Sequence, residues 1–277
     1  MPAAGGWLAV QFEILPFERA LQEAERLDEP TRLTVTSSPR LGPEQTIEFA
    51  GQLSALGHTV IPHLAARMVR DRDHLERLLV GVEAEGMDEL FVIGGDNSQP
   101  VGNFTSASEL LELIRERPHG VSTFGIAAYP EGHPLIDDHT LAKELDRKSR
   151  LADYMVTQMT FDAGGLVDWL RETRARGVDL PVRLGLPGVV DRRRLLEVSV
   201  RIGVGPSLSF VRKQRGLRQL LRRPSQTVDD LFDALAPAAA DPGLNVDGFH
   251  YFTLNQLYDT WSWERGKHTT YEEAENR

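Results

Sequence analysis

The segment Glu89-Leu-Phe-Val-Ile-Gly-Gly-Asp96 shows the pattern that decides the fold: a short apolar run followed at once by a polar side chain. Eight such runs occur along the chain, and the stretches between them have helical periodicity. The runs are Trp7–Phe12, Leu33–Val35, Thr59–Ile61, Glu89–Ile93, Thr123–Ala128, Tyr154–Val156, Val182–Leu184 and Gly248–Phe252. Eight alternations of strand and helix predict an α/β protein, a single (β/α)8 TIM barrel.

The length of 277 residues suits one such barrel with modest extras. We expect residues 1–263 to form the barrel and residues 264–277 a polar, loosely ordered tail. One predicted helix follows Asp73, a candidate N-cap, and has apolar residues at the spacing of one buried face; the next begins at Ser106 or Ser108. The basic segment 212–223 is either a solvated helix face or an anion site for a cofactor phosphate or a glutamyl tail.

Composition excludes several classes of protein. The formal charge of −10 argues against nucleic-acid binding, and no run approaches the length of a membrane span. With no cysteine, the chain has no disulfide, no thiol nucleophile and no cysteine-held iron–sulfur cluster. The first residues lack the charged and apolar regions of a signal peptide, so we expect a cytoplasmic protein.

Polar residues that can bind or react follow almost every run, and in a barrel the carboxyl ends of the strands carry the chemistry. These residues are Glu13, Ser37, Ser38, His63, Asp96, Tyr129, Glu131, Gln158, Gly185, Pro187, Thr253 and Asn255. Glu13 has apolar neighbours, and burial would raise its pKa toward that of a general acid; the alternative is a surface glutamate. Asp96 follows two glycines that let a ligand approach, although it could equally be a turn or cap residue.

The segment Ala127-Ala-Tyr-Pro-Glu-Gly-His-Pro134 is the densest group of candidate functional residues. Tyr129, Glu131 and His133 place an aromatic ring, a carboxylate and an imidazole within five residues, which is enough to line one pocket. A rigid loop packed by its two prolines is the other interpretation.

Seven motifs in order resemble those of methylenetetrahydrofolate reductases, from about Phe12 to Asn255. They are Phe12-Glu13, His63-Leu64, Gly95-Asp96, Ala128-Tyr-Pro-Glu-Gly-His-Pro134, Thr157-Gln158 with Phe161-Asp162, Leu186-Pro-Gly188 and Phe249-His-Tyr-Phe-Thr-Leu-Asn255. The resemblance implies reduction of 5,10-methylenetetrahydrofolate to 5-methyltetrahydrofolate. It implies that Glu13 protonates N10, that Asp96 stabilises the 5-iminium cation, and that Gln158 and Tyr129 position the reactants. We expect His63, Tyr129, Glu131 and His133 to contact the cofactor.

Two positions depart from the family in motifs associated with its flavin. The usual Arg-Gly-Asp is Gly94-Gly95-Asp96 here, and the usual His-Leu-Thr-Cys is His63-Leu64-Ala65-Ala66. An arginine that would face the flavin phosphates and a hydroxyl donor are therefore missing. We expect hydride to pass directly from NADH, or from NADPH, to the folate without FAD. A complete dinucleotide fingerprint is absent, so the nicotinamide would bind at the barrel rim.

Other functions stay open at this point. FAD could bind through backbone donors, which would give a flavin-dependent reductase. Glu131, His133 and Asp137–His139 could supply ligands to a metal-dependent hydrolase or lyase, although we assign no metal site. A folate-binding relative without turnover is the non-enzymatic alternative. No motif fixes an interface, so we expect a monomer or a small homo-oligomer.

Overall fold

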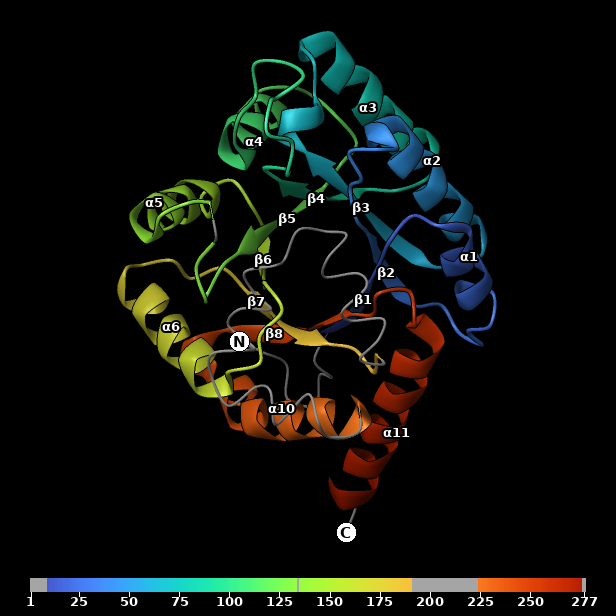
Figure 1. Ribbon diagram of the computed structural model, residues 1–277, viewed down its shortest axis with the longest axis vertical. Coiled ribbons are helices and arrows are strands. Elements are labelled where there is room, and N and C mark those ends of the chain that lie inside the picture. Colours follow the sequence, from blue (N-terminus) through green and yellow to red (C-terminus); the bar gives the residue numbers. More distant parts are fainter. Residues whose placement is uncertain (1–8, 134, 191–223, 276–277) are drawn as a thin grey trace.

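Eight parallel strands close into a barrel in chain order in the computed structural model, which describes residues 9–133, 135–190 and 224–275 (Figure 1). The strands are β1 Ala9–Ile14, β2 Arg32–Val35, β3 Thr59–Ala65, β4 Glu89–Ile93, β5 Thr123–Ala128, β6 Tyr154–Thr157, β7 Val182–Pro187 and β8 Val246–Phe252. Every neighbouring pair is parallel, including β8 with β1. The predicted (β/α)8 barrel is confirmed.

Several strands are longer than their apolar runs. β3 continues through Pro62 and His63 to Ala65, and β1 includes Glu13, so the His63 and Glu13 side chains lie within strands rather than beyond them. The sequence pattern placed the ends of these two runs too early because polar residues near the end of a strand look like the start of a loop. In a barrel, however, inward positions near the rim can hold polar side chains without ending the strand.

Helices surround the barrel in Figure 1. They are α1 Glu18–Ala24, α2 Gly42–Ala55, α3 Arg72–Ala84, α4 Ala107–Arg115, α5 Asp138–Lys148, α6 Ala163–Ala175, α10 Pro224–Ala239 and α11 Leu257–Glu275, with 3-10 turns η1 Ala66–Met68 and η2 Pro242–Leu244. Ser106 caps α4, as predicted. The cap of α3 is Asp71 rather than Asp73, because the extended backbone of Asp71 lets its carboxylate accept the His74 N–H at 2.8 Å.

In Figure 1 the C-terminal helix α11 lies beside one end of α10 and projects past it. It continues from Leu257 to Glu275, so the helix runs through residue 264, where the sequence led us to expect the barrel to end. Trp261 and Glu264 are buried on this helix, which holds it against the barrel. The basic segment 212–223 lies outside the described residues. Among the described helices, none is long and apolar enough to cross a bilayer.

The interior of the barrel has two unlike halves. On one side an apolar cluster of Ile61, Phe91, Tyr154 and Val156 fills the space between β3, β4 and β6. On the other side, around β7, β8 and β1, lies a group of buried polar residues that we call the polar half: Gln11 of β1, Arg183 of β7 and His250 of β8. His63 of β3 and Glu89 of β4 are buried as well. Buried polar side chains of this kind need hydrogen-bond partners.

Candidate active site

Glu13 lies at the carboxyl end of β1, and its position is fixed by the loop after β8. The side chain of Thr253 donates to the Glu13 carbonyl oxygen at 2.7 Å. Two residues further, the amide of Asn255 makes two hydrogen bonds to the backbone of Leu15: its Oδ1 accepts the N–H at 2.7 Å and its Nδ2 donates to the carbonyl at 3.1 Å. The Phe-His-Tyr-Phe-Thr-Leu-Asn motif thus holds the main chain at Glu13 and just beyond it, at Leu15.

Two buried imidazoles face one oxygen of the Glu13 carboxylate. Nε2 of His250 lies 3.4 Å and Nε2 of His63 lies 3.9 Å from Glu13 Oε2. Neither nitrogen has a hydrogen-bond partner within the part of the chain that the structure describes, so both are open to the carboxylate. Burial lowers the pKa of His63 to about 4, with the nearby Glu13 charge acting in the opposite direction. His63 is therefore neutral at ordinary pH, and the carboxylate of Glu13 is not held in a strong ion pair by it.

Tyr129 and Asp96 lie close enough to Glu13 to share its electrostatic environment. Burial, together with the negative charges of Asp96 and Glu13, raises the pKa of the Tyr129 phenol to about 12. The Tyr129 ring also packs edge-on against His133, with 5.3 Å between centroids. Burial lowers the pKa of His133, and the Asp96 charge opposes that change. The structure thus brings these rim residues from β1, β4 and β5 into one cluster.

The remaining predicted residues lie at the same rim but have other contacts. Gln158 directly follows β6, and its side-chain oxygen accepts the Met159 N–H at 2.9 Å. Glu131 accepts the hydroxyl of Thr160 at 2.6 Å. The pKa of Glu131 is raised by desolvation, although this hydrogen bond opposes the shift. The Glu131 carboxylate therefore ties the loop after β5 to the loop after β6.

The proposed metal ligands do not converge. Asp137 caps α5 by accepting the backbone N–H of Thr140 at 2.9 Å, and Asp138 and His139 belong to the first turn of that helix. No group of three or more side chains suited to a metal ion is found among residues 9–133, 135–190 and 224–275. The metal-dependent alternative has no support in this part of the chain.

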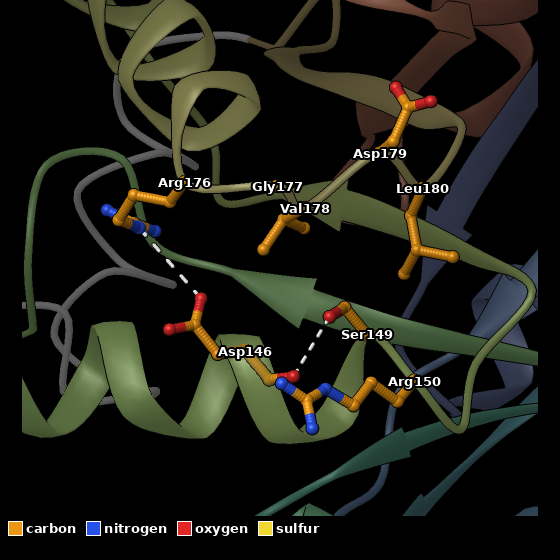
Figure 2. A pocket seen from close by; sticks show the side chains of 8 residues that line it. All are labelled: Asp146, Ser149, Arg150, Arg176, Gly177, Val178, Asp179 and Leu180. Carbon is orange, nitrogen blue, oxygen red and sulfur yellow. Dashed lines mark hydrogen bonds and ion pairs between the residues drawn. The ribbon is translucent and has the colours of Figure 1, made fainter.

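A pocket of about 270 Å³ lies away from this cluster, between the end of α5 and the loop that precedes β7 (Figure 2). Asp146 and Arg176 face each other across it, with 3.9 Å between Oδ1 and Nε. The pocket is at the opposite end of the strands from Glu13. In barrels of this type that end contributes to stability, and the catalytic residues lie at the other end. None of the predicted site residues lines it.

Sequence reasoning did not assign a role to three residues of the polar half. Gln11 Nε2 donates to His250 Nδ1 at 2.7 Å, and Arg183 Nη1 donates to Gln11 Oε1 at 2.5 Å. A signal was present in the sequence: each residue interrupts an apolar strand, as in Val182-Arg-Leu184 and Phe249-His-Tyr251. A charged or amide side chain inside a buried strand needs a partner, so such interruptions indicate a buried polar network.

The fold and the rim cluster define a (β/α)8-barrel protein with its candidate site at the carboxyl ends of the strands. Residues 17–196 match the family model described as Methylenetetrahydrofolate reductase, and the chain belongs to this family. Methylenetetrahydrofolate reductase 2 of Saccharomyces cerevisiae is 28% identical over 116 residues, which is 38% of this chain and 19% of the yeast protein. Methylenetetrahydrofolate reductase 1 of Schizosaccharomyces pombe is 33% identical over 97 residues, 34% of this chain and 16% of that protein. The matched segments thus span less than a fifth of these relatives.

A solved structure is similar over nearly the whole barrel. It is a protein from Clostridium thermocellum that binds two copies of 5-methyl-5,6,7,8-tetrahydrofolic acid, with a TM-score of 0.62 and 13% sequence identity. The similarity covers 90% of this chain and 93% of that one. At this identity the comparison supports the fold.

Proposed function

We propose that the protein reduces 5,10-methylenetetrahydrofolate to 5-methyltetrahydrofolate with a reduced nicotinamide, by direct hydride transfer. Protonation of N10 opens the five-membered ring and leaves a 5-iminium cation. A hydride from the nicotinamide then converts the iminium carbon to a methyl group. Overall, one proton and one hydride are added to the folate, and the nicotinamide is oxidised.

The arrangement of Glu13 carries this proposal. Its side chain is 17% exposed, whereas His250 and His63 beside it are 1% and 5% exposed. The carboxyl group therefore lies between the two buried histidines and the open rim, where a substrate nitrogen can reach it. A positioned acid of this kind contributes roughly 10²–10⁴-fold to a rate.

In this proposal Asp96 stabilises the cation. It is exposed at the end of β4, on the same rim as Glu13, and it acts electrostatically on both Tyr129 and His133. A carboxylate near a developing positive charge lowers the barrier to forming it. With its pKa near 12, Tyr129 stays neutral and positions a reactant by packing and hydrogen bonding, and Gln158 supplies an amide at the neighbouring strand.

The folate ligand is supported by family membership and by the methyltetrahydrofolate that the Clostridium thermocellum protein binds. The nicotinamide would lie at the rim beside the Tyr129–His133 pair, with NADH as the first choice and NADPH as the alternative. His63 is buried, so only the edge of its ring can contact the folate or the nicotinamide.

The residues near β3 and β4 do not fit a flavin held by side-chain donors. Ala65, Ala66 and Gly94 have no hydrogen-bonding side chain, and a Cβ built on Gly94 meets nothing within 4 Å. The nearest guanidinium, that of Arg67, donates to the carbonyl oxygens of Asn97 at 2.7 Å, Ser98 at 3.0 Å and Thr105 at 3.4 Å. Arg67 thus holds the loop after Asp96 and does not replace the missing phosphate donor.

The test is NADH oxidation by thoroughly desalted protein, shown by its absorption spectrum to be free of flavin, with methylenetetrahydrofolate as the second substrate. We expect turnover without added FAD and formation of methyltetrahydrofolate in equal amount. Activity only after FAD is added would retain the reductase and reject direct transfer. No activity under either condition, combined with folate binding, would establish the non-catalytic alternative.

A further inference from the structure

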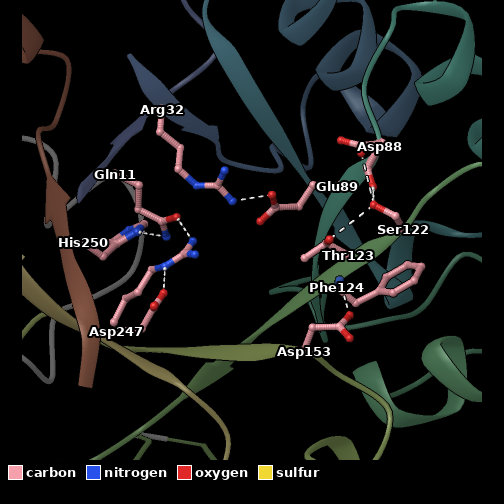
Figure 3. Close-up of polar contacts among 11 residues, drawn as sticks. Gln11, Arg32, Asp88, Glu89, Ser122, Thr123, Phe124, Asp153, Asp247 and His250 are labelled. Carbon is pink, nitrogen blue, oxygen red and sulfur yellow. Dashed lines mark hydrogen bonds and ion pairs between the residues drawn. The ribbon is translucent and has the colours of Figure 1, made fainter. Parts of the chain in front are cut away.

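A chain of hydrogen bonds crosses the polar half of the barrel from one end to the other. Asp247 Oδ2 accepts from Arg183 Nε at 3.0 Å, Arg183 Nη1 donates to Gln11 Oε1 at 2.5 Å, and Gln11 Nε2 donates to His250 Nδ1 at 2.7 Å. Figure 3 shows Gln11 against His250, with Asp247 beyond. The hydrogen-bonded chain ends at His250, whose Nε2 lies 3.4 Å from Glu13 Oε2 in a close contact rather than a hydrogen bond.

Arg183 determines the direction of the hydrogen bonds that run from it through Gln11 to His250. A guanidinium only donates, so the oxygen of the Gln11 amide must face Arg183. The amide nitrogen then faces His250 and donates to Nδ1, which must be unprotonated. A neutral imidazole with an unprotonated Nδ1 carries its proton on Nε2, and that nitrogen faces Glu13.

We propose that Arg183 and Gln11 are positioning residues that fix His250 in the tautomer protonated at Nε2, so that Glu13 Oε2 is always an acceptor and the transferable proton resides on Oε1. The catalytic consequence rests on the proposed function, whereas the tautomer does not. In the step itself, the O–H bond at Oε1 breaks, N10 of the folate gains the proton and its bond to the methylene carbon breaks. The carboxylate that remains keeps the Nε2–H of His250 as a donor.

The surroundings of His250 direct Nε2 toward Glu13. His250 is 1% exposed, its Nε2 has no hydrogen-bond partner among the described residues, and Glu13 Oε2 lies 3.4 Å from it. The ring packs against Phe252 at 4.7 Å between centroids, which restricts its rotation. The other charged or titratable groups that face Glu13 are His63 from β3, with Asp96 and Tyr129 from the rim. Of the two imidazoles at Glu13, His250 is the one for which the structure describes a complete chain of donors.

Gln11→Glu is the most direct test, because it keeps the shape of the side chain and replaces the amide nitrogen that donates to His250 by an oxygen that can only accept. A carboxylate at position 11 accepts from Arg183 and from His250, so His250 must place a proton on Nδ1. Gln11→Met removes the link without supplying a new acceptor. Thr173→Val is the matched control, since Thr173 is also fully buried and its hydroxyl has no partner, but it lies on α6 outside the barrel interior.

The first readout is the ¹⁵N spectrum of the ring nitrogens in histidine-labelled protein without substrate. The chain has eight histidines, and His250 is assigned by the signal that disappears in His250→Gln. We expect a protonated Nε2 and an unprotonated Nδ1 in the wild type and in Thr173→Val, and a protonated Nδ1 in Gln11→Glu. A wild-type proton on Nδ1, or the wild-type pattern retained in Gln11→Glu, would overturn the tautomer assignment whether or not the protein is a reductase.

The second readout is steady-state turnover of methylenetetrahydrofolate. We expect kcat to fall roughly 10–100-fold in Gln11→Glu and in Gln11→Met, the size typical for loss of an outer partner of a reacting group, with little change in KM. A changed tautomer with unchanged kcat would overturn the positioning role while leaving the reductase intact. An inactive wild type would reject the proposed function, and the ¹⁵N result would still decide the tautomer.

Discussion

Thr253 and Glu13 are 240 positions apart in the sequence, yet they are joined by two hydrogen bonds to a single atom. The backbone N–H of Thr253 and its hydroxyl both donate to the Glu13 carbonyl oxygen, at 3.2 Å and 2.7 Å. The hydroxyl also accepts the Asn255 N–H at 3.3 Å. This small arrangement closes the barrel between β8 and β1 directly at the proposed acid.

Thr253→Val keeps the volume of this buried side chain and removes only the hydroxyl. We expect the free energy of unfolding to fall by about 1–3 kcal/mol, because the Asn255 N–H loses its acceptor in a buried site. Turnover should fall as well, since Glu13 is then less firmly placed. Urea denaturation and steady-state kinetics measure the two effects. Thr253→Ser retains the hydroxyl and should recover turnover; an equal loss in both variants would contradict the hydroxyl's role.

Glu13→Gln removes the acidic proton while preserving size and polarity. We expect turnover to fall by roughly 10²–10⁴-fold, the usual contribution of a general acid. Folate binding, measured by calorimetry, should persist, because the amide still fits between His250 and the rim. Undiminished NADH-dependent turnover in this variant would reject Glu13 as the acid.

His63 should make stability depend on pH. Its pKa is about 4 in the folded protein against 6.5 for an unperturbed histidine, so the unfolded chain binds a proton first as the pH falls. The stability associated with the neutral ring is thus fully present above pH 6.5 and is lost as the pH falls toward 4, by about 3 kcal/mol. In His63→Gln this loss is absent. Denaturation of both proteins at pH 7 and pH 4 should show that the wild type loses more stability than His63→Gln. An equal loss in the two proteins would contradict this role of His63.

Gly94→Arg tests the proposal that flavin binding has been given up. The open space at Gly94 accommodates a side chain, and an arginine there restores a donor for phosphate. We expect FAD affinity to rise by roughly 10–100-fold relative to the wild type, in line with one charge-assisted hydrogen bond. Quenching of flavin fluorescence measures the affinity, and Gly94→Gln serves as an uncharged control. If the wild type already binds FAD tightly, Ala65 and Gly94 are not the determinants.

The barrel could be predicted because its strands are short apolar runs separated by helical periodicity, and that pattern is local. The position of Glu13, Asp96 and Tyr129 at one rim could be predicted for the same reason, since each lies at or just after the carboxyl end of a strand; their roles stay predictions. The sequence does not distinguish Asp71 from Asp73 as the cap of α3, because both are aspartates just before the first buried residues of the helix. Only the backbone conformation distinguishes them.

The contacts within the polar half of the barrel could not be predicted from the sequence. Gln11, Arg183 and His250 are far apart in the chain, and their contacts depend on the register of β1, β7 and β8. His250 pairs with Gln11 on one side and with Gly185 on the other. Periodicity shows that a side chain points inward, but it does not show which inward side chain lies opposite. The interruption of an apolar strand by a polar residue is the only local sign.

The closure between β1 and β8 has a consequence for the order in which the protein matures. Glu13 leaves the ribosome long before Thr253 and Asn255, which hold its backbone, and before His250, which faces its carboxylate. A nascent chain that has reached only β7 carries the acid without any of these anchors. We therefore expect the proposed activity to be acquired in one late event, when the last strand is translated and inserted, and a chain terminated before β8 to be inert rather than partly active.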